Sequence, residues 1–264
     1  MAGPKGDVKP IWEAKGGDRA LGHAHVWERA LSRREFVGGT AGLAGLVAGS
    51  ALGWPKLATA ASPANTFPTT PVLDSFIRPN APTLGPDWLG AQEGHEQLAI
   101  ISDRAGCATW DIGADIWAPG GSIATEGPDC EVYCTIPKIA SGTGMCITLY
   151  ARVQGSALAS TVSAYLLQIT SGPRARLYYC VNGRVPTTKV IPLSGWSYQK
   201  TSDGDKWGLS CVGNAISAWY GPRGVWQSAP IISATDSHLP AAGGIMVSVG
   251  YDCRITDFGG GTRA

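Results

Sequence analysis

The sequence lacks long runs of like charge and any basic patch. Its 264 residues carry 21 Lys and Arg against 20 Asp and Glu, so the formal net charge is +1. Domains that bind nucleic acid usually gather Lys and Arg on one face. The composition therefore gives no reason to expect a nucleic-acid partner.

Signatures of common enzyme classes are also missing. No G-x-S-x-G nucleophile elbow occurs, and residues 61–264 contain neither a G-x-G-x-x-G sequence nor a phosphate-binding P-loop. The same region has only two histidines, His95 and His238. We interpret Asp236 and Ser237, which precede His238, as turn residues, because a catalytic triad is assembled from separated segments.

A further absence concerns periodicity. No long stretch shows the 3.6-residue period of a helix, and no repeat of 20–50 residues is present. The 36 Gly and 18 Pro make up about a fifth of the chain, which suits a β-rich fold with many turns. A chain of this length can bury a substantial core, in one large domain or two small ones.

The first sixty residues differ from the rest in charge and pattern. They hold eight Lys and Arg against five Asp and Glu, a balance of +3, whereas residues 61–264 hold thirteen against fifteen, a balance of −2. The segment "SRREFV" begins at Ser32 and resembles a twin-arginine translocation signal, with Arg33, Arg34 and Phe36 at its defining positions. The next residues, 37–53, carry no charge and include six glycines and four alanines, as a mildly apolar signal requires.

This resemblance implies an exported protein that folds before it crosses the membrane, with a receptor reading the arginine pair. Small residues at Ala58 and Ala60 suit a signal peptidase, and we expect cleavage after Ala60. The alternative is an uncleaved anchor, since Phe36 to Trp54 is long enough to cross a bilayer. We interpret the chain as a polar leader (1–31), a signal segment with its helix outside the domain (32–60), a linker (61–71) and one domain (72–262).

From Val72 onward, short stretches alternate apolar and polar residues and are rich in Val, Ile, Tyr and Thr. This alternation is typical of half-buried strands, and many short strands at regular spacing favour a sandwich or barrel. Asn182-Gly183 and Gly213-Asn214 predict hairpin turns. The strongest strand patterns cover 131–138, 145–153, 163–170, 175–181, 207–212, 215–220 and 244–258.

The stretch "LDSFIRPNAPTLGPDWLG", residues 73–90, resembles the opening of concanavalin A-like lectin/glucanase domains of the LamG-like kind. That opening usually reads D-x-F-x-R-x-(D/N)-G-x-L-G-x-x-W, and here Pro82 and one extra residue interrupt its middle. The matching residues are Asp74, Phe76, Arg78, Asn80, Leu84, Gly85 and Trp88.

Three later segments, 206–229, 232–249 and 253–261, also resemble this family and follow its order. The resemblance covers most of residues 72–262 and implies an all-β fold, with two antiparallel sheets packed as a jelly-roll sandwich. It also implies that the first and last strands lie side by side, with the rings of Phe76 and Phe258 buried at one sheet edge. In this family the concave sheet often carries the binding site.

The same superfamily includes glucanases, which use an E-x-D-x-x-E pattern on one strand. Retaining hydrolysis needs two carboxyl groups about 5 Å apart. The nearest segment here, "EGPDCE" from Glu126, has the spacing E-x-x-D-x-E, and Pro128 interrupts the strand. Asp129 and Glu131 could share a strand face and are the only catalytic candidates. Because the glucanase pattern is not matched, we expect a protein that is not an enzyme.

Cysteine is the unusual feature of the domain, because export would permit disulfides and an odd number leaves at least one thiol. Cys130 and Cys134 share a strand face but lie roughly 13 Å apart, too far to pair with each other. We expect one or two disulfides, with their connectivity open, and several buried thiols. The cysteines are Cys107, Cys130, Cys134, Cys146, Cys180, Cys211 and Cys253.

The acidic pieces Asp203-Gly204-Asp205 and Asp111…Asp115 match no calcium-binding loop. A Cys-x-x-x-Cys zinc site would need a second close pair, which the sequence does not offer. We therefore expect no metal or cofactor, with calcium as the alternative that lectin-like relatives suggest.

Tryptophan gives the best indication of function, since flat indole rings can stack on the apolar faces of sugars. We expect Trp117 and Trp196, which lie near turns, and Tyr220 to contact a ligand. Trp219 and Tyr220 point to opposite faces of one strand, so we expect only one of them to lie in the core. Trp88 and Trp207 are expected in the core, where large aromatic residues are also needed.

Together these features predict an exported, non-catalytic, lectin-like domain whose partner is a glycan or cell-surface polysaccharide. It would be extracellular, periplasmic or held at the cell surface, and would meet the export machinery and the membrane only in transit. One alternative is a divergent glycoside hydrolase or polysaccharide lyase, which a carboxylate pair in a groove would favour. Another is a structural or adhesion domain without a small ligand, which a flat polar sheet face would favour.

Overall fold

The computed structural model describes residues 66–90, 96–109, 112–140, 145–155, 162–183 and 190–263. All of them belong to one unit, Ala60–Ala264. The predictions for the leader, for Arg33, Arg34 and Phe36, and for cleavage after Ala60 lie outside these residues. Within the described ranges, no helix is long and apolar enough to span a membrane.

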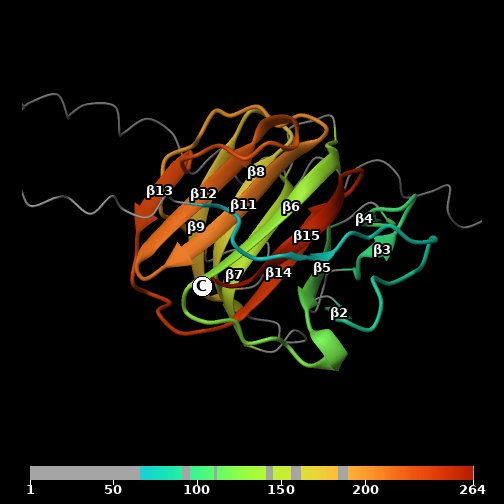
Figure 1. Ribbon diagram of the computed structural model, residues 1–264, viewed down its shortest axis with the longest axis horizontal. Helices are drawn as coiled ribbons and strands as arrows, with labels where there is room; N and C mark the ends of the chain where they lie inside the picture. The colour runs from blue at the N-terminus through green and yellow to red at the C-terminus, as the bar shows by residue number, and fades with distance from the viewer. Residues whose placement is uncertain are drawn as a thin grey trace, which may run out of the picture. The chain divides into compact units, whose positions relative to one another are not determined.

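The domain is an all-β sandwich of two antiparallel sheets, as predicted (Figure 1). In the eight-stranded sheet the order is β13-β12-β11-β6-β15-β4-β3, and β1 also pairs with β15. Its strands are β1 (Val72–Asp74), β3 (Ala99–Ile100), β4 (Ala105–Gly106), β6 (Cys130–Lys138), β11 (Asp205–Val212), β12 (Ala215–Gly221), β13 (Ile232–Thr235) and β15 (Arg254–Thr262).

The seven-stranded sheet has the order β10-β9-β8-β7-β14-β5-β2. Two short 3-10 turns, η3 (Pro119–Gly121) and η4 (Pro222–Gly224), follow β5 and β12. The strands of this sheet are β2 (Trp88–Gly90), β5 (Ile112–Trp117), β7 (Met145–Gln154), β8 (Val162–Thr170), β9 (Ala175–Gly183), β10 (Val190–Pro192) and β14 (Gly244–Gly250).

The predicted strand patterns all fall on strands, and one of the two predicted turns is confirmed. Gly213-Asn214 connects β11 to β12, with Gly213 at φ +52°. The tight turn at Asn182-Gly183 is wrong: both residues belong to β9, and the partner strand β10 begins only at Val190. The stretch 244–258 is two strands rather than one, because the chain turns at Asp252, whose φ is +64°.

The period-two pattern decides which side chains fill the space between the sheets. In β6, Val132 and Ile136 point into the main core, while Glu131 and Tyr133 point to the outer face. Trp88 and Trp207 are buried, as expected. Burial of alternate apolar residues from both sheets supplies the main stabilisation of such a sandwich.

The two ends of the domain meet as the family resemblance implies. β1 pairs with β15, and Phe76 and Phe258 are both fully buried. Trp88 lies between their rings, with centroids 5.6 Å from Phe76 and 4.9 Å from Phe258.

A carboxylate fixes this corner of the domain. Asp74 accepts hydrogen bonds from Arg78 Nη1 (2.6 Å) and Nη2 (2.9 Å), from Phe76 N (2.8 Å) and from Trp88 Nε1 (2.9 Å). The opening motif thus serves the fold, because Asp74 joins three of its residues to β1.

Candidate functional site

The outer face of the eight-stranded sheet is crossed by residues 66–71, which we name the N-terminal strap. In Figure 1 this segment, coloured cyan, runs across β12, β11 and β6 toward β15. Phe67 is only 7% exposed, and its ring stacks on Trp219 at 4.8 Å with an interplanar angle of 2°. Part of the expected linker therefore packs against the domain.

Glycine makes room for this contact. Trp219, Gly208 and Tyr133 lie side by side across β12, β11 and β6. A Cβ at Gly208 would overlap the Phe67 ring, so only glycine leaves the gap that the ring fills. The rings of Tyr133 (6.1 Å) and Trp226 (4.8 Å) meet Phe67 edge-on and complete an aromatic pocket around it.

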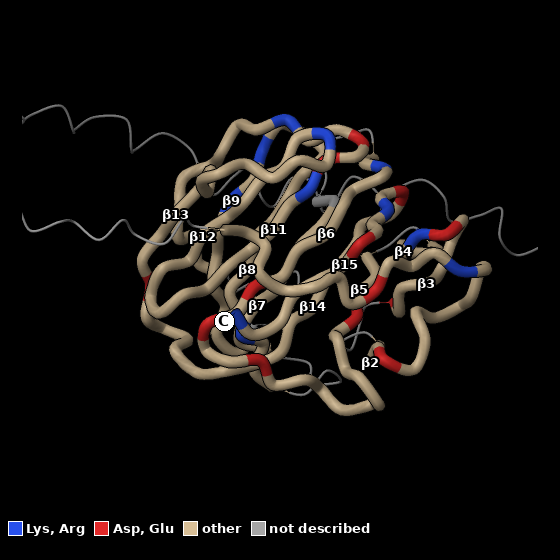
Figure 2. The backbone as a smooth tube through the Cα atoms, viewed as in Figure 1, with Lys and Arg blue, Asp and Glu red and all other residues tan. Residues whose placement is uncertain are grey.

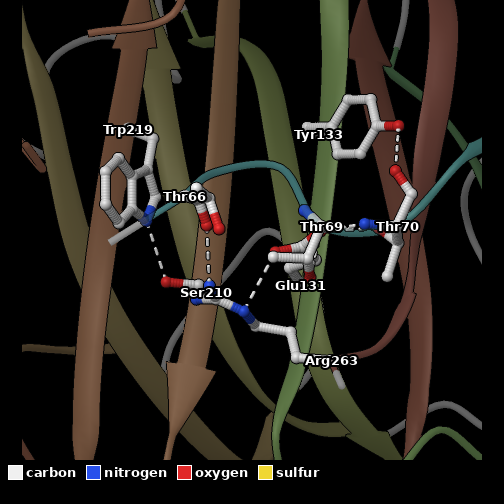
Figure 3. Close-up of polar contacts among 8 residues, drawn as sticks. All are labelled: Thr66, Thr69, Thr70, Glu131, Tyr133, Ser210, Trp219 and Arg263. Carbon is white, nitrogen blue, oxygen red and sulfur yellow. Dashed lines mark hydrogen bonds and ion pairs between the residues drawn. The ribbon is translucent and has the colours of Figure 1, made fainter. Parts of the chain in front are cut away.

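Glu131 anchors the strap, as Figure 3 shows. Its Oε1 accepts hydrogen bonds from Thr69 N (2.6 Å), Thr70 N (2.8 Å) and Thr70 Oγ1 (2.7 Å), and its Oε2 lies 3.2 Å from Arg263 Nε. Arg263 Nη2 also donates to the carbonyl of Thr66, 2.9 Å away. The carboxylate is fully buried under the strap.

These contacts involve the two catalytic candidates, Asp129 and Glu131. Glu131 Oε1 is occupied by the strap and its Oε2 lies against Arg263, and Asp129 Oδ1 accepts a hydrogen bond from Gly213 N at 2.7 Å. Glu126, the third acid of the segment, accepts from Thr262 N and Oγ1. Each carboxylate thus holds backbone in place, and the segment forms no acid–nucleophile pair facing an open site.

Three side chains gather beside the outer face of the seven-stranded sheet, and we name Arg176, Tyr178 and Trp196 the Trp196 cluster. The Arg176 guanidinium carbon lies 5.3 Å from the Trp196 ring centroid and 5.4 Å from that of Tyr178. The two rings meet edge-on at 6.4 Å. Such cation–π contacts orient all three groups together.

Backbone hydrogen bonds hold Trp196 against β9. Ser197 and Ala175 exchange two of them (2.8 and 2.9 Å), and Leu193 N donates to Leu177 O at 3.0 Å. Arg176 Nε donates to Ser194 O at 2.7 Å. The indole is therefore presented in a fixed position, half-buried beside the sheet.

The sheet face next to this cluster is apolar along one row and polar along the next. Ile116, Met246, Tyr150, Leu166 and Tyr178 follow one another across five strands and are all buried, and Ser248, Thr148, Gln168 and Arg176 form the neighbouring row. Burial raises the pKa of the Tyr178 hydroxyl, which keeps it neutral and able to donate. Tyr178 of the cluster lies at the β9 end of the apolar row, and Arg176 lies at the β9 end of the polar row.

The structure does not bring the three predicted ligand residues together. Trp117 packs against the main core, with its ring edge-on to Trp88 at 5.3 Å. Its strand β5 lies four strands from β9, about 19 Å away at the usual spacing, so one sugar unit cannot touch both Trp117 and Trp196.

Tyr220 is a correction to the sequence-based expectation. It is 5% exposed, and its hydroxyl donates to Asp205 Oδ2 at 2.7 Å. Trp219 is buried as well, although the two side chains point to opposite faces. Of the two, Tyr220 lies in the main core between the sheets, whereas Trp219 is buried in a separate cluster beneath the N-terminal strap.

Arg176 and Tyr178 were not among the ligand residues predicted from the sequence, although their alternation in "ARLYYCV" places both on one strand face. Their contact with Trp196 depends on how the chain returns beside β9, and no local pattern encodes that return. Trp117 and Trp196, which lie near turns, are both half-buried, whereas Trp88 and Trp207 are buried, so proximity to a turn distinguished these two pairs.

The described carboxylates of the acidic loop pieces hold backbone groups, and Asp111 lies outside the described residues. Asp203 Oδ1 accepts from Ile139 N, and Asp205 is buried and accepts from Ser202 N and Arg223 N. Asp115 is buried too, and its Oδ2 accepts from Leu98 N at 2.6 Å. Among the described residues, no group of three His, Cys, Asp or Glu is placed to hold a metal ion.

Charged positions are spread over the loops and strand ends, with Lys and Arg interspersed among Asp and Glu (Figure 2). The strands themselves carry mainly uncharged positions.

Solved structures with a similar fold share little sequence with this chain. The carbohydrate-binding module CBM66 from Bacillus subtilis is 13% identical, with a TM-score of 0.43, over 67% of this chain and 94% of its own. A legume lectin-like domain from Entamoeba histolytica is 8% identical, with a TM-score of 0.48, over 67% and 91%. A Bacillus licheniformis beta-glucanase is 11% identical, with a TM-score of 0.43, over 72% and 97%. No protein-family model and no curated protein matches the sequence.

Proposed function

We propose that this chain is an exported, non-catalytic carbohydrate-binding domain and that the Trp196 cluster is its sugar contact. The observation that carries the proposal is a half-buried indole held in place beside a guanidinium and a neutral phenol. Sugar rings offer an apolar face for the indole and hydroxyl groups for polar side chains. A few fixed polar groups beside an apolar surface are what small-ligand sites usually contain.

Each member of the cluster has a separate part in this proposal. Trp196 stacks on the sugar ring, Arg176 donates to hydroxyl or ring oxygens, and Tyr178 supports the guanidinium. Backbone hydrogen bonds already hold residues 193–197 in place, so less conformational entropy is lost there on binding. The burial of Glu131 beneath the strap disfavours the hydrolase alternative, since this carboxylate is not available to attack a glycosidic bond.

The test is a binding screen of soluble polysaccharides and arrayed glycans with the wild-type chain, Trp196→Ala and Trp117→Ala. Loss of one stacking contact should weaken binding of any hit about tenfold in Trp196→Ala. Trp117→Ala is the matched control. The Trp117 indole packs against the main core, so its removal should lower stability rather than affinity for the glycan. Equal affinity of wild type and Trp196→Ala would refute the assigned site, and absence of any glycan hit would refute the function.

The exported state is proposed on the twin-arginine resemblance. Replacing Arg33 and Arg34 by lysine should keep the chain in the cytoplasm of its host at full length. The exported wild-type protein should begin at residue 61, which N-terminal sequencing can establish.

A further inference from the structure

Two cysteines of the eight-stranded sheet face each other directly across neighbouring strands. Cys130 is the first residue of β6 and pairs in register with Cys211 of β11. Both side chains are fully buried in the main core, so they point to the same side of the sheet. Opposed residues of antiparallel strands have Cα atoms about 4.5–5.5 Å apart. Disulfides span Cα separations of about 4.4–6.8 Å, so the register brings the two residues within disulfide range.

A buried arginine is clamped beside this pair. Arg152 Nε donates to Pro128 O at 2.6 Å, and its Nη2 donates to Gly213 O at 2.7 Å. These carbonyls lie two residues before Cys130 and two residues after Cys211. A hydrogen bond from the Cys211 thiol, together with the positive charge of Arg152, lowers the pKa of Cys130, whereas burial raises that of Cys211. Cys130 is therefore the more readily ionised thiol of the two.

Other thiols with described surroundings lie beside different partners. Cys134 lies opposite Trp207, and Cys180 lies opposite Ala164 and Val190 in the other sheet. Cys107 donates to Glu96 at 3.4 Å. Among the strand pairs that the structure describes, Cys130 and Cys211 are the cysteines that lie opposite each other in register.

We propose that Cys130 and Cys211 form a disulfide when the domain meets a disulfide-containing oxidant. During local opening at the start of β6, the Cys130 thiolate attacks one sulfur of the oxidant and releases the first thiol. The Cys211 sulfur then attacks the mixed disulfide and releases the second. Two protein S–H groups and one oxidant disulfide become one protein disulfide and two small thiols, and both protons end on the released thiols.

The experiment maps cysteines in the full chain after incubation of the reduced, folded protein with oxidised glutathione. Denaturation, alkylation and digestion with trypsin and a glutamate-specific protease should leave Cys130 in residues 127–131 and Cys211 in residues 207–223. Cleavage after Glu126, Glu131 and Lys138 separates Cys130 from the other cysteines of the same tryptic fragment. We expect these two peptides joined, with a mass about 2 Da below their sum.

Two variants sharpen the assignment. Cys211→Ser should abolish the joined species and leave peptide 127–131 alkylated. The matched control, Cys134→Ser, alters a buried thiol of the same strand and should leave the joined species unchanged. Should Cys211→Ser fail to fold, the wild-type map decides by itself. Alkylation of both peptides after oxidation, or their linkage to other cysteines, would overturn the proposal.

Discussion

Phe67→Ala tests whether the N-terminal strap is an integral part of the folded domain. Burying a Phe side chain contributes about 1.5–3 kcal/mol, and favourable ring pairs add roughly 0.5–1.5 kcal/mol each. Phe67 is 7% exposed and meets three aromatic rings, one stacked and two edge-on. Some of this loss is recovered when the emptied pocket collapses. We therefore expect the free energy of unfolding to fall by about 3–4 kcal/mol, within the range for buried Phe→Ala changes.

The assay is urea unfolding of the full chain followed by tryptophan fluorescence, because Trp219 and Trp226 touch the Phe67 ring. Ile77→Ala is the matched control: Ile77 lies nearby in the chain but is 72% exposed, so its change should stay within about 0.5 kcal/mol. A loss below about 1 kcal/mol in Phe67→Ala would show that the strap adds little to the fold.

Two further predictions concern positions on the sheets. Gly208→Ala should displace the Phe67 ring and destabilise the domain, but should cost much less in a Phe67→Ala background, and a double-mutant cycle of urea midpoints measures this coupling. Additive changes in the free energy of unfolding would show that Gly208 and Phe67 are not coupled. Burial raises the pKa of Asp115 to about 8, whereas an unfolded aspartate titrates near 3.9, so the native state holds a proton that the unfolded state releases. This residue should therefore lower stability as pH rises from about 4 to 8, by at most ~1.4 kcal/mol per pH unit, and Asp115→Asn should remove that slope; an unchanged slope would contradict the raised pKa.

The main features of the fold are readable from the sequence because strand alternation is local. Trp207, Leu209 and Cys211 alternate along β11 and already indicate its core face, and Gly213-Asn214 indicates where the strand turns. The hairpin at Asn182-Gly183 failed because β9 continues through both residues to pair with β8. Local turn propensity there yields to strand pairing set by the rest of the sheet.

The candidate site was less predictable, since it depends on contacts between distant segments. Trp196 could be selected from its turn context, but its partners Arg176 and Tyr178 come from a strand about twenty residues earlier. Tyr220 was expected at a ligand because nothing local to β12 indicates which of its two faces packs into the main core. Residue type suggested an aromatic ligand contact, and only the tertiary arrangement could select which aromatic residue provides it.

The position of β15 sets an order for assembly of the domain. This most C-terminal of the described strands lies inside its sheet, between β6 and β4, and it also pairs with β1 from the other end of the domain. Until β15 has been synthesised, β6 has an open edge and β1 has no partner in the sheet. The sandwich must therefore close late, and a chain interrupted before Arg254 would present bare strand edges that invite aggregation.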